Sequence, residues 1–184
     1  MEHKGTKTIK TKRLVLRPFK PEDAEKMFLN WANDPEVTRY LTWDAHKDLD
    51  ETRSALSTWV QSYEEESYYH WAIEFEGEPI GGIGLANVSD IDCKAYIGYC
   101  LGRAFWNKGF MSEALEAMLD FLFLEVGFNK LSAFHDTENP ASGRVMEKVG
   151  MKQEGILRQE KRKRDGRFAD MRLLAVLQEE WKSR

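Results

Sequence analysis

A glycine-containing segment between residues 101 and 113 carries the clearest chemical signal in the sequence. It reads Leu-Gly-Arg-Ala-Phe-Trp-Asn-Lys-Gly-Phe-Met-Ser-Glu and leads from an apolar, strand-like stretch into a helical pattern. A turn of this kind directs backbone N–H groups and the positive end of a helix toward a bound anion. The segment therefore predicts a phosphate-binding loop, although Gly109 by itself could equally serve to ease a turn.

A second candidate follows at Asn139-Pro140-Ala-Ser142. Asparagine is a preferred N-cap and proline a preferred first helical residue, so a short helix is expected to begin here. Ser142 would then lie in the first turn, where its hydroxyl could donate a hydrogen bond to a substrate or simply face solvent. On capping logic alone, Asn139 is a structural residue.

The elements that position these segments follow from the hydrophobic pattern. Apolar residues spaced three and four apart predict helices after Pro21, after Asp48, and from Met111 to a stop at Gly127. The order strand, helix, strand, helix from residue 94 to residue 150 indicates a parallel crossover. Strands are expected over 13–17, 71–75, 80–85, 94–101 and 130–136, and 154–164 and 168–177 are expected to form a hairpin around Asp165-Gly166.

Composition limits the class of protein. The 184 residues include 42% hydrophobic and 32% charged residues, which is typical of a folded globular chain. A net charge of −4 disfavours nucleic acid as the main partner. Cys93 and Cys100 lack the spacing of a zinc site or of a disulfide framework, so no metal is expected and a reducing, cytoplasmic setting fits. Neither a signal peptide nor a membrane span is recognisable, so we expect no membrane association.

Several ordered blocks together resemble the Gcn5-related N-acetyltransferases (GNAT), and more narrowly their RimJ/RimL-type branch of ribosomal-protein N-terminal acetyltransferases. The resemblance runs from about Thr11 to Trp181, which predicts a single domain over 1–184 with its core at about 11–181. The blocks are Thr11-Lys-Arg-Leu-Val-Leu-Arg-Pro18, Ile97-Gly-Tyr99, Phe105 to Ala114, Asn139 to Met151, Glu154-Gly-Ile-Leu-Arg158 and Asp165-Gly-Arg-Phe-Ala-Asp170.

The resemblance implies a mixed α/β (α+β) GNAT fold. Its central, twisted, mostly antiparallel sheet would be flanked by helices and would bind acetyl-CoA between two splayed parallel strands that end near Leu101 and Asp136. Asn107 stands where the family often has glycine, but asparagine tolerates positive φ well. Met111 replaces a commonly small residue and is expected to narrow the loop. The implied cofactor-binding residues are Cys100, Leu101, Trp106, Asn107, Lys108, Gly109, Phe110, Met111, Ser112, Asn139 and Ser142.

The resemblance also implies direct attack of an amine on acetyl-CoA, without an acyl-enzyme on Cys100, which we interpret as a packing residue beside the cofactor. Asn139 would lie near the pantetheine arm, and Ser142 near the sulfur, where it would act as general acid. The glutamate that often precedes the Ile-Gly-Tyr block is Tyr96 here. The remaining candidates for the general base are Glu74, Glu160, His70 and His135, or a water molecule held by one of them; Glu160 is favoured.

The absent glutamate favours an acceptor that needs little help to lose its proton. An α-amine, with a pKa of about 8, is neutral to about a tenth at pH 7, whereas a lysine side chain, with a pKa of about 10.4, is neutral to roughly one part in a few thousand. We therefore expect an α-amine of a protein or peptide as acceptor, and a homodimer would fit this branch. The alternatives are a small-molecule amine (an aminoglycoside, polyamine or amino-acid conjugate) or a non-catalytic acyl-CoA binding module.

The basic run Lys161-Arg-Lys-Arg164 is expected to be a solvated face.

Overall fold

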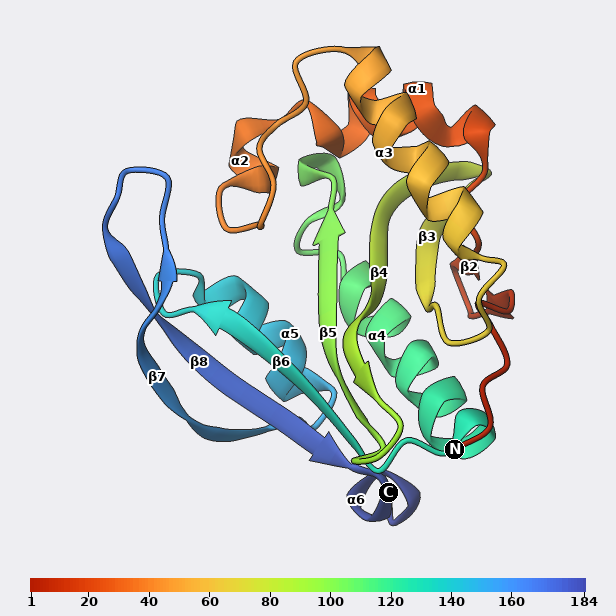
Figure 1. Ribbon diagram of the computed structural model, residues 1–184, viewed down its shortest axis with the longest axis vertical. Helices are drawn as coiled ribbons and strands as arrows, with labels where there is room; N and C mark the ends of the chain where they lie inside the picture. The colour runs from red at the N-terminus through yellow and green to blue at the C-terminus, as the bar shows by residue number, and fades with distance from the viewer.

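Eight β-strands form one sheet in the computed structural model, which describes residues 1–184 (Figure 1). Neighbouring strands follow the order β1-β2-β3-β4-β5-β6-β8-β7, and every pair is antiparallel except β5 and β6. This arrangement confirms the predicted mixed α/β fold. The strands are β1 (Ile9–Lys10), β2 (Val15–Arg17), β3 (His70–Phe75), β4 (Glu78–Ser89), β5 (Lys94–Leu101), β6 (Lys130–Asp136), β7 (Lys152–Arg162) and β8 (Phe168–Leu177).

Helices pack on both faces of the sheet. The first helical stretch runs without interruption from a 3-10 turn at Pro21–Asp23 through α1 to a π-helical turn at Phe28–Ala32. The helix before β6 likewise begins as α4 and ends in a π-helical turn at Phe121–Val126. The α-helices are α1 (Ala24–Met27), α2 (Pro35–Thr38), α3 (Leu49–Ser62), α4 (Phe110–Asp120), α5 (Pro140–Lys148) and α6 (Gln178–Lys182), and a 3-10 turn lies at Arg103–Phe105.

The alternation of side chains along β3 separates two hydrophobic cores. Trp71 and Ile73 are fully buried in a large core that also contains the apolar face of α4. Ala72, between them, points to the other face and joins a smaller core with residues of α1 and α3 and with Trp31 of the π-helical turn. Each large side chain buried in this way contributes about 1.5–3 kcal/mol. Figure 1 shows α4 behind the sheet and α3 in front of it.

The parallel strands β5 and β6 pair along only half of their length. Their register runs from Lys94 opposite Lys130 to Ile97 opposite Ala133, after which the two strands separate. Beyond that point β5 remains paired with β4, up to Leu101 opposite Gly81, and β6 remains paired with β8. The strands therefore open into the V seen in Figure 1, which confirms the expected splayed pair.

The shortest elements differ from the sequence-based expectations. Strand β1 has two residues, α2 four and α6 five, and none of the three was predicted. Gly127 ends the long helix with a φ of 90°, as expected. None of the helices has the length and apolar character needed to cross a bilayer.

Candidate active site

The V between β5 and β6 opens into a cleft of about 1280 Å³. Its walls come from the outer halves of both strands, the loop after β5, the start of α5, the segment 40–43 and the bulged part of β7. Among the implied cofactor-binding residues, Lys108 alone does not line it. The predicted residues that do are Cys100, Leu101, Trp106, Asn107, Gly109, Phe110, Met111, Ser112, Asn139, Ser142 and Glu160.

The loop before α4 leaves a row of backbone donors without partners. Asn107 and Gly109 both adopt left-handed conformations, with φ of 60° and 77°, as the asparagine and glycine at these positions allow. Gly109 is the N-cap of α4 but supplies no capping side chain, and the first intrahelical bond is donated by Glu113 N–H to the Gly109 carbonyl. The N–H groups of the first three helical residues therefore remain free, which is the donor set that a pyrophosphate requires.

The side chain of Met111 does not narrow this loop, contrary to expectation. Phe110 and Met111 are only 4% and 6% exposed and belong to the core under α4. Their backbone N–H groups, and not their side chains, are thus available to a ligand. Trp106, by contrast, is 40% exposed at the cleft and is held by a bond from its indole N–H to the Leu101 carbonyl (2.7 Å).

An arginine far away in the sequence fixes the loop. Arg13 donates to the Lys108 carbonyl (2.9 Å) and to the Glu113 carboxylate (2.6 Å), and its guanidinium lies 4.4 Å from the Phe110 ring centroid. Burial opposes ionisation of Glu113, but hydrogen bonds from Thr11 and Arg13 keep the pKa of its carboxyl below its usual value. Lys108 thus contributes its carbonyl to the support of the loop. Sequence reasoning missed Arg13 because its partners lie about a hundred residues away.

The start of α5 brings two predicted residues to the cleft. The Asn139 side chain accepts a hydrogen bond from Ser142 N–H (3.4 Å), so it caps the helix as predicted. The Ser142 hydroxyl lies 3.0 Å from the hydroxyl of Tyr99 on β5. Burial raises the pKa of Tyr99 to about 12, although its hydrogen bond with Ser142 opposes the shift. Tyr99 was not predicted as a site residue.

Two of the four candidate bases are engaged elsewhere. Glu74 forms an ion pair with Arg17, which also binds Asp23, and it does not line the cleft. His135 is 4% exposed, and its Nδ1 lies 2.8 Å from the Asp136 carbonyl, so this nitrogen carries the hydrogen. The opposite nitrogen, Nε2, has no partner and packs against Gly143 of α5. Glu74 therefore lies outside the cleft, and the unpartnered nitrogen of His135, although the residue lines the cleft, is buried against α5.

His70 and Glu160 also line the cleft. Burial lowers the pKa of His70 to about 4, so its imidazole is neutral at pH 7, and its Nδ1 lies 3.2 Å from the Tyr68 hydroxyl. Glu160 lies in an irregular stretch of β7, where pairing shifts between Leu157 and Lys161 and Gln159 adopts a φ of 55°. This bulge brings an exposed carboxylate to the rim of the cleft.

Cys100 has the environment of an unreactive thiol. Burial raises the pKa of its thiol to about 12, so the thiolate, which is the nucleophilic form, is scarce at neutral pH. The side chain packs against the smaller core. These features agree with the interpretation of Cys100 as a packing residue at the cleft wall.

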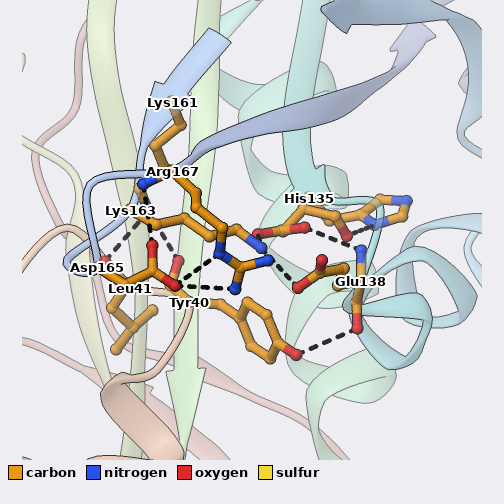
Figure 2. Close-up of polar contacts among 9 residues, drawn as sticks. Tyr40, Leu41, His135, Glu138, Lys161, Lys163, Asp165 and Arg167 are labelled. Carbon is orange, nitrogen blue, oxygen red and sulfur yellow. Dashed lines mark hydrogen bonds and ion pairs between the residues drawn. The ribbon is translucent and has the colours of Figure 1, made fainter. Parts of the chain in front are cut away.

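The basic run at the end of β7 contacts segment 38–43 and the end of β6, so the expectation that it forms only a solvated face is wrong; Figure 2 shows the contacts of Lys161 and Lys163. Lys161 Nζ donates to the carbonyls of Tyr40 (2.9 Å) and Leu41 (3.1 Å). Lys163 forms ion pairs with Asp136 (3.1 Å) and Glu138 (2.6 Å). We call residues 161–164 the strap, because they tie the β7–β8 hairpin to segment 38–43 and to the end of β6.

Arg164 completes the strap. Its guanidinium donates to the carbonyls of Thr38 (3.1 Å) and Trp43, and it also pairs with Asp44. Burial lowers the pKa of Lys161, and Asp136 partly offsets this effect. Segment 38–43 and β7 are thereby held together as one wall of the cleft.

Comparison with known proteins agrees with this geometry. Residues 13–152 match the family model of the acetyltransferase (GNAT) domain. The uncharacterized N-acetyltransferase YoaA of Bacillus subtilis (strain 168) is 34% identical over 153 residues, which cover 82% of this chain and 86% of that protein. The ribosomal protein uS5-alanine N-acetyltransferase of Escherichia coli (strain K12) is 24% identical over 182 residues, 93% of this chain and 91% of the relative.

A solved structure shares the fold. RimL, described as a ribosomal L7/L12 alpha-N-protein acetyltransferase in complex with coenzyme A, superimposes with a TM-score of 0.84 at 20% identity, covering 93% of this chain and 98% of that one. The splayed strands, the free N–H groups at the start of α4 and the family match lead to one conclusion. The chain belongs to the GNAT acetyltransferase family and is an N-acetyltransferase that uses acetyl-CoA.

Proposed function

We propose that the protein transfers the acetyl group of acetyl-CoA to an α-amine at the N-terminus of a protein or peptide. The observation that carries this proposal is the residue at position 96 of β5, on the side of the cleft where the acceptor would bind. There Tyr96 occupies the position at which the resemblance to the family implies a glutamate, and it stacks on Phe134, with ring centroids 4.9 Å apart and planes 13° apart. With no carboxylate at that position, an acceptor that is already partly neutral at pH 7 suits the site best.

Two carboxylates in the lining of the cleft support the same acceptor. Glu36 and Glu160 both line the cleft, as do the aromatic side chains of Tyr40 and Trp43. Carboxylates attract a protonated amine, and aromatic faces accommodate the chain that carries it. The likeness to an enzyme named for ribosomal protein uS5-alanine adds a relative that acts on an α-amine.

The residues would divide the work as follows. The amine attacks the acetyl carbonyl directly, while Glu160, alone or through one water molecule, accepts the proton that the amine loses. Beyond Ile97, β5 has no partner on its β6 side, so alternate N–H groups there face the cleft and can hold the developing oxyanion. Ser142 donates a hydrogen bond or proton to the departing sulfur, beside the pantetheine arm near Asn139.

A panel of acceptors tests the proposal. Thiol release from acetyl-CoA is followed with three probes: a peptide with a free N-terminus, the same peptide with a blocked N-terminus and one internal lysine, and small amines such as a polyamine and an aminoglycoside. We expect the free N-terminus to give the highest kcat/KM, rising with pH up to about 8 as the α-amine deprotonates. A higher kcat/KM for a small amine or for the lysine peptide, or no turnover with any amine, would refute the acceptor assignment.

The role of Glu160 has its own test. Glu160→Gln should lower kcat/KM about a hundredfold and weaken the pH dependence. Glu179→Gln, at an exposed position of α6, is the matched control and should leave both unchanged. Wild-type activity in Glu160→Gln would remove Glu160 from the mechanism and leave His70 and His135 as the candidate bases that line the cleft.

A further inference from the structure

Tyr99 directs both of its polar contacts at a single residue. Its hydroxyl donates to the Ser142 carbonyl (3.1 Å) and lies 3.0 Å from Ser142 Oγ. Tyr99 is the one residue that forms a hydrogen bond with Ser142 Oγ. The ring itself packs against the large core, so the phenol is presented to the start of α5 from a fixed position.

Counting hydrogens shows that this contact has two arrangements. A tyrosine hydroxyl has one hydrogen and can donate to only one of the two Ser142 oxygens at a time. When it donates to the Ser142 carbonyl, the serine hydroxyl must direct its own hydrogen at the tyrosine oxygen. When it donates to Ser142 Oγ, the serine hydrogen is released and can turn into the cleft.

The phenol does not lose its proton in either arrangement. With a pKa of about 12, caused mainly by burial, it stays protonated at neutral pH. Tyr99 therefore orients hydrogen and does not ionise.

We propose that Tyr99 is a positioning residue that controls the direction of the Ser142 hydroxyl, releasing the serine hydrogen toward the sulfur of coenzyme A when the cleft is filled. The proposal rests on the proposed role of Ser142 at the sulfur. The O–H group of Tyr99 turns from the Ser142 carbonyl to Ser142 Oγ, and the O–H group of Ser142 turns from Tyr99 to the sulfur. No covalent bond is made or broken at Tyr99.

A double-mutant cycle tests the proposal by activity. Tyr99→Phe, Ser142→Ala and the double variant are compared with the wild-type enzyme, with acetyl-CoA and the best acceptor as substrates. We expect Tyr99→Phe to lower kcat threefold to tenfold with little change in either KM, because one hydrogen bond to the catalytic hydroxyl is lost. The double variant should be no slower than Ser142→Ala alone, since Tyr99 acts only through Ser142.

Binding gives a second readout that does not depend on turnover. Isothermal titration compares coenzyme A with desulfo-coenzyme A, which lacks the thiol. The wild-type protein should prefer coenzyme A by several-fold. This preference should shrink in Tyr99→Phe and should be lost to the same extent in Ser142→Ala and in the double variant. Thermal unfolding of each variant shows whether folding is intact.

Tyr63→Phe is the matched control. Tyr63 is also a partly buried tyrosine in contact with a core, but its hydroxyl bonds only to the main chain, at Phe19 N–H and the His70 carbonyl. Tyr63→Phe should lower the free energy of unfolding and leave the preference for coenzyme A unchanged. Any effect of Tyr63→Phe on kcat should multiply with the effect of Ser142→Ala.

The possible outcomes separate the two proposals. Two outcomes would overturn the role of Tyr99 alone. In the first, the effects of Tyr99→Phe and Ser142→Ala on kcat multiply. In the second, Tyr99→Phe behaves as wild type while Ser142→Ala is impaired. A Ser142→Ala variant equal to wild type in both rate and binding preference would overturn the role of Ser142, and with it that of Tyr99. Absence of acetyl transfer to any amine would refute the proposed function, and the binding comparison would still decide the role of Tyr99.

Discussion

Replacing Gly143 with alanine tests how α5 is held against the sheet. A β-carbon at this position would lie 2.6 Å from His135 Nε2 and 2.9 Å from Cε1, closer than carbon atoms approach a ring in folded proteins. His135 cannot easily turn away, because its ring is buried and its Nδ1 donates to the Asp136 carbonyl. The helix must therefore move outward by several tenths of an ångström.

The magnitude of the effect follows from two opposed contributions. Overpacking of a buried site costs about 1–3 kcal/mol, and alanine stabilises a helix interior by about 1 kcal/mol relative to glycine. We expect Gly143→Ala to lower the free energy of unfolding by about 1 kcal/mol. Because Ser142 is the neighbouring residue, the same displacement disturbs its 3.0 Å contact with Tyr99. A misplacement of about 1 Å can cost a hundredfold in rate, so kcat should fall about tenfold.

Urea unfolding and steady-state kinetics measure these effects. A pair of variants at the exposed position 147, Glu147→Ala and Glu147→Gly, gives the alanine–glycine difference for this helix without any packing change. Adding His135→Ala to Gly143→Ala should restore much of kcat, because the obstructing ring is removed. The reasoning fails if Gly143→Ala is more stable than the wild type by the full alanine–glycine difference and keeps its kcat.

Four further predictions concern the supports of the site. Arg13→Met should weaken coenzyme A binding about tenfold by titration calorimetry, because the loop before α4 loses its ties to Lys108 and Glu113; unchanged affinity would contradict this. Asn139→Ala should lower the free energy of unfolding by about 0.5–2 kcal/mol in urea titrations, whereas a stability equal to wild type would show that the cap is dispensable. The pKa of His70 is about 4 in the folded protein and about 6.5 in the unfolded chain. Neutral His70 therefore contributes up to about 3 kcal/mol to the free energy of unfolding, and this contribution is complete above pH 6.5 and is lost as the pH falls toward 4. His70→Gln should flatten urea-derived stability across that window, and an unaltered slope would refute the assignment. Lys161→Met should raise the KM of the acceptor severalfold and leave that of acetyl-CoA unchanged, so a change confined to acetyl-CoA would show that the strap acts on the other side.

Local signals made most of the fold predictable from the sequence. The strand at Lys130–Asp136 and the helix capped by Asn139 have the predicted bounds, because a β pattern and a cap are set by adjacent residues. The left-handed conformation of Asn107 was likewise predictable from its residue type. Strand β1 and the short helix α2 were missed because two and four residues are too few to show a period.

The contacts that complete the site depend on tertiary structure. Tyr99 meets Ser142 across 43 positions, and Arg13 meets Glu113 across 100. No spacing rule relates such residues. The strap was misjudged for a different reason. Two of its four cations, Lys161 and Arg164, bind main-chain carbonyls, and every residue type has a carbonyl, so the sequence does not mark these partners.

The use of main-chain carbonyls also bears on how acceptor selectivity can diverge among relatives. Lys161 and Arg164 hold the segment 38–43 through atoms that every amino acid possesses. The side chains of Tyr40, Leu41 and Trp43, which line the cleft, can therefore be exchanged without loss of those bonds. Under the proposed function, substitutions in this short segment would alter which amine is accepted, while the wall that carries it stays in place.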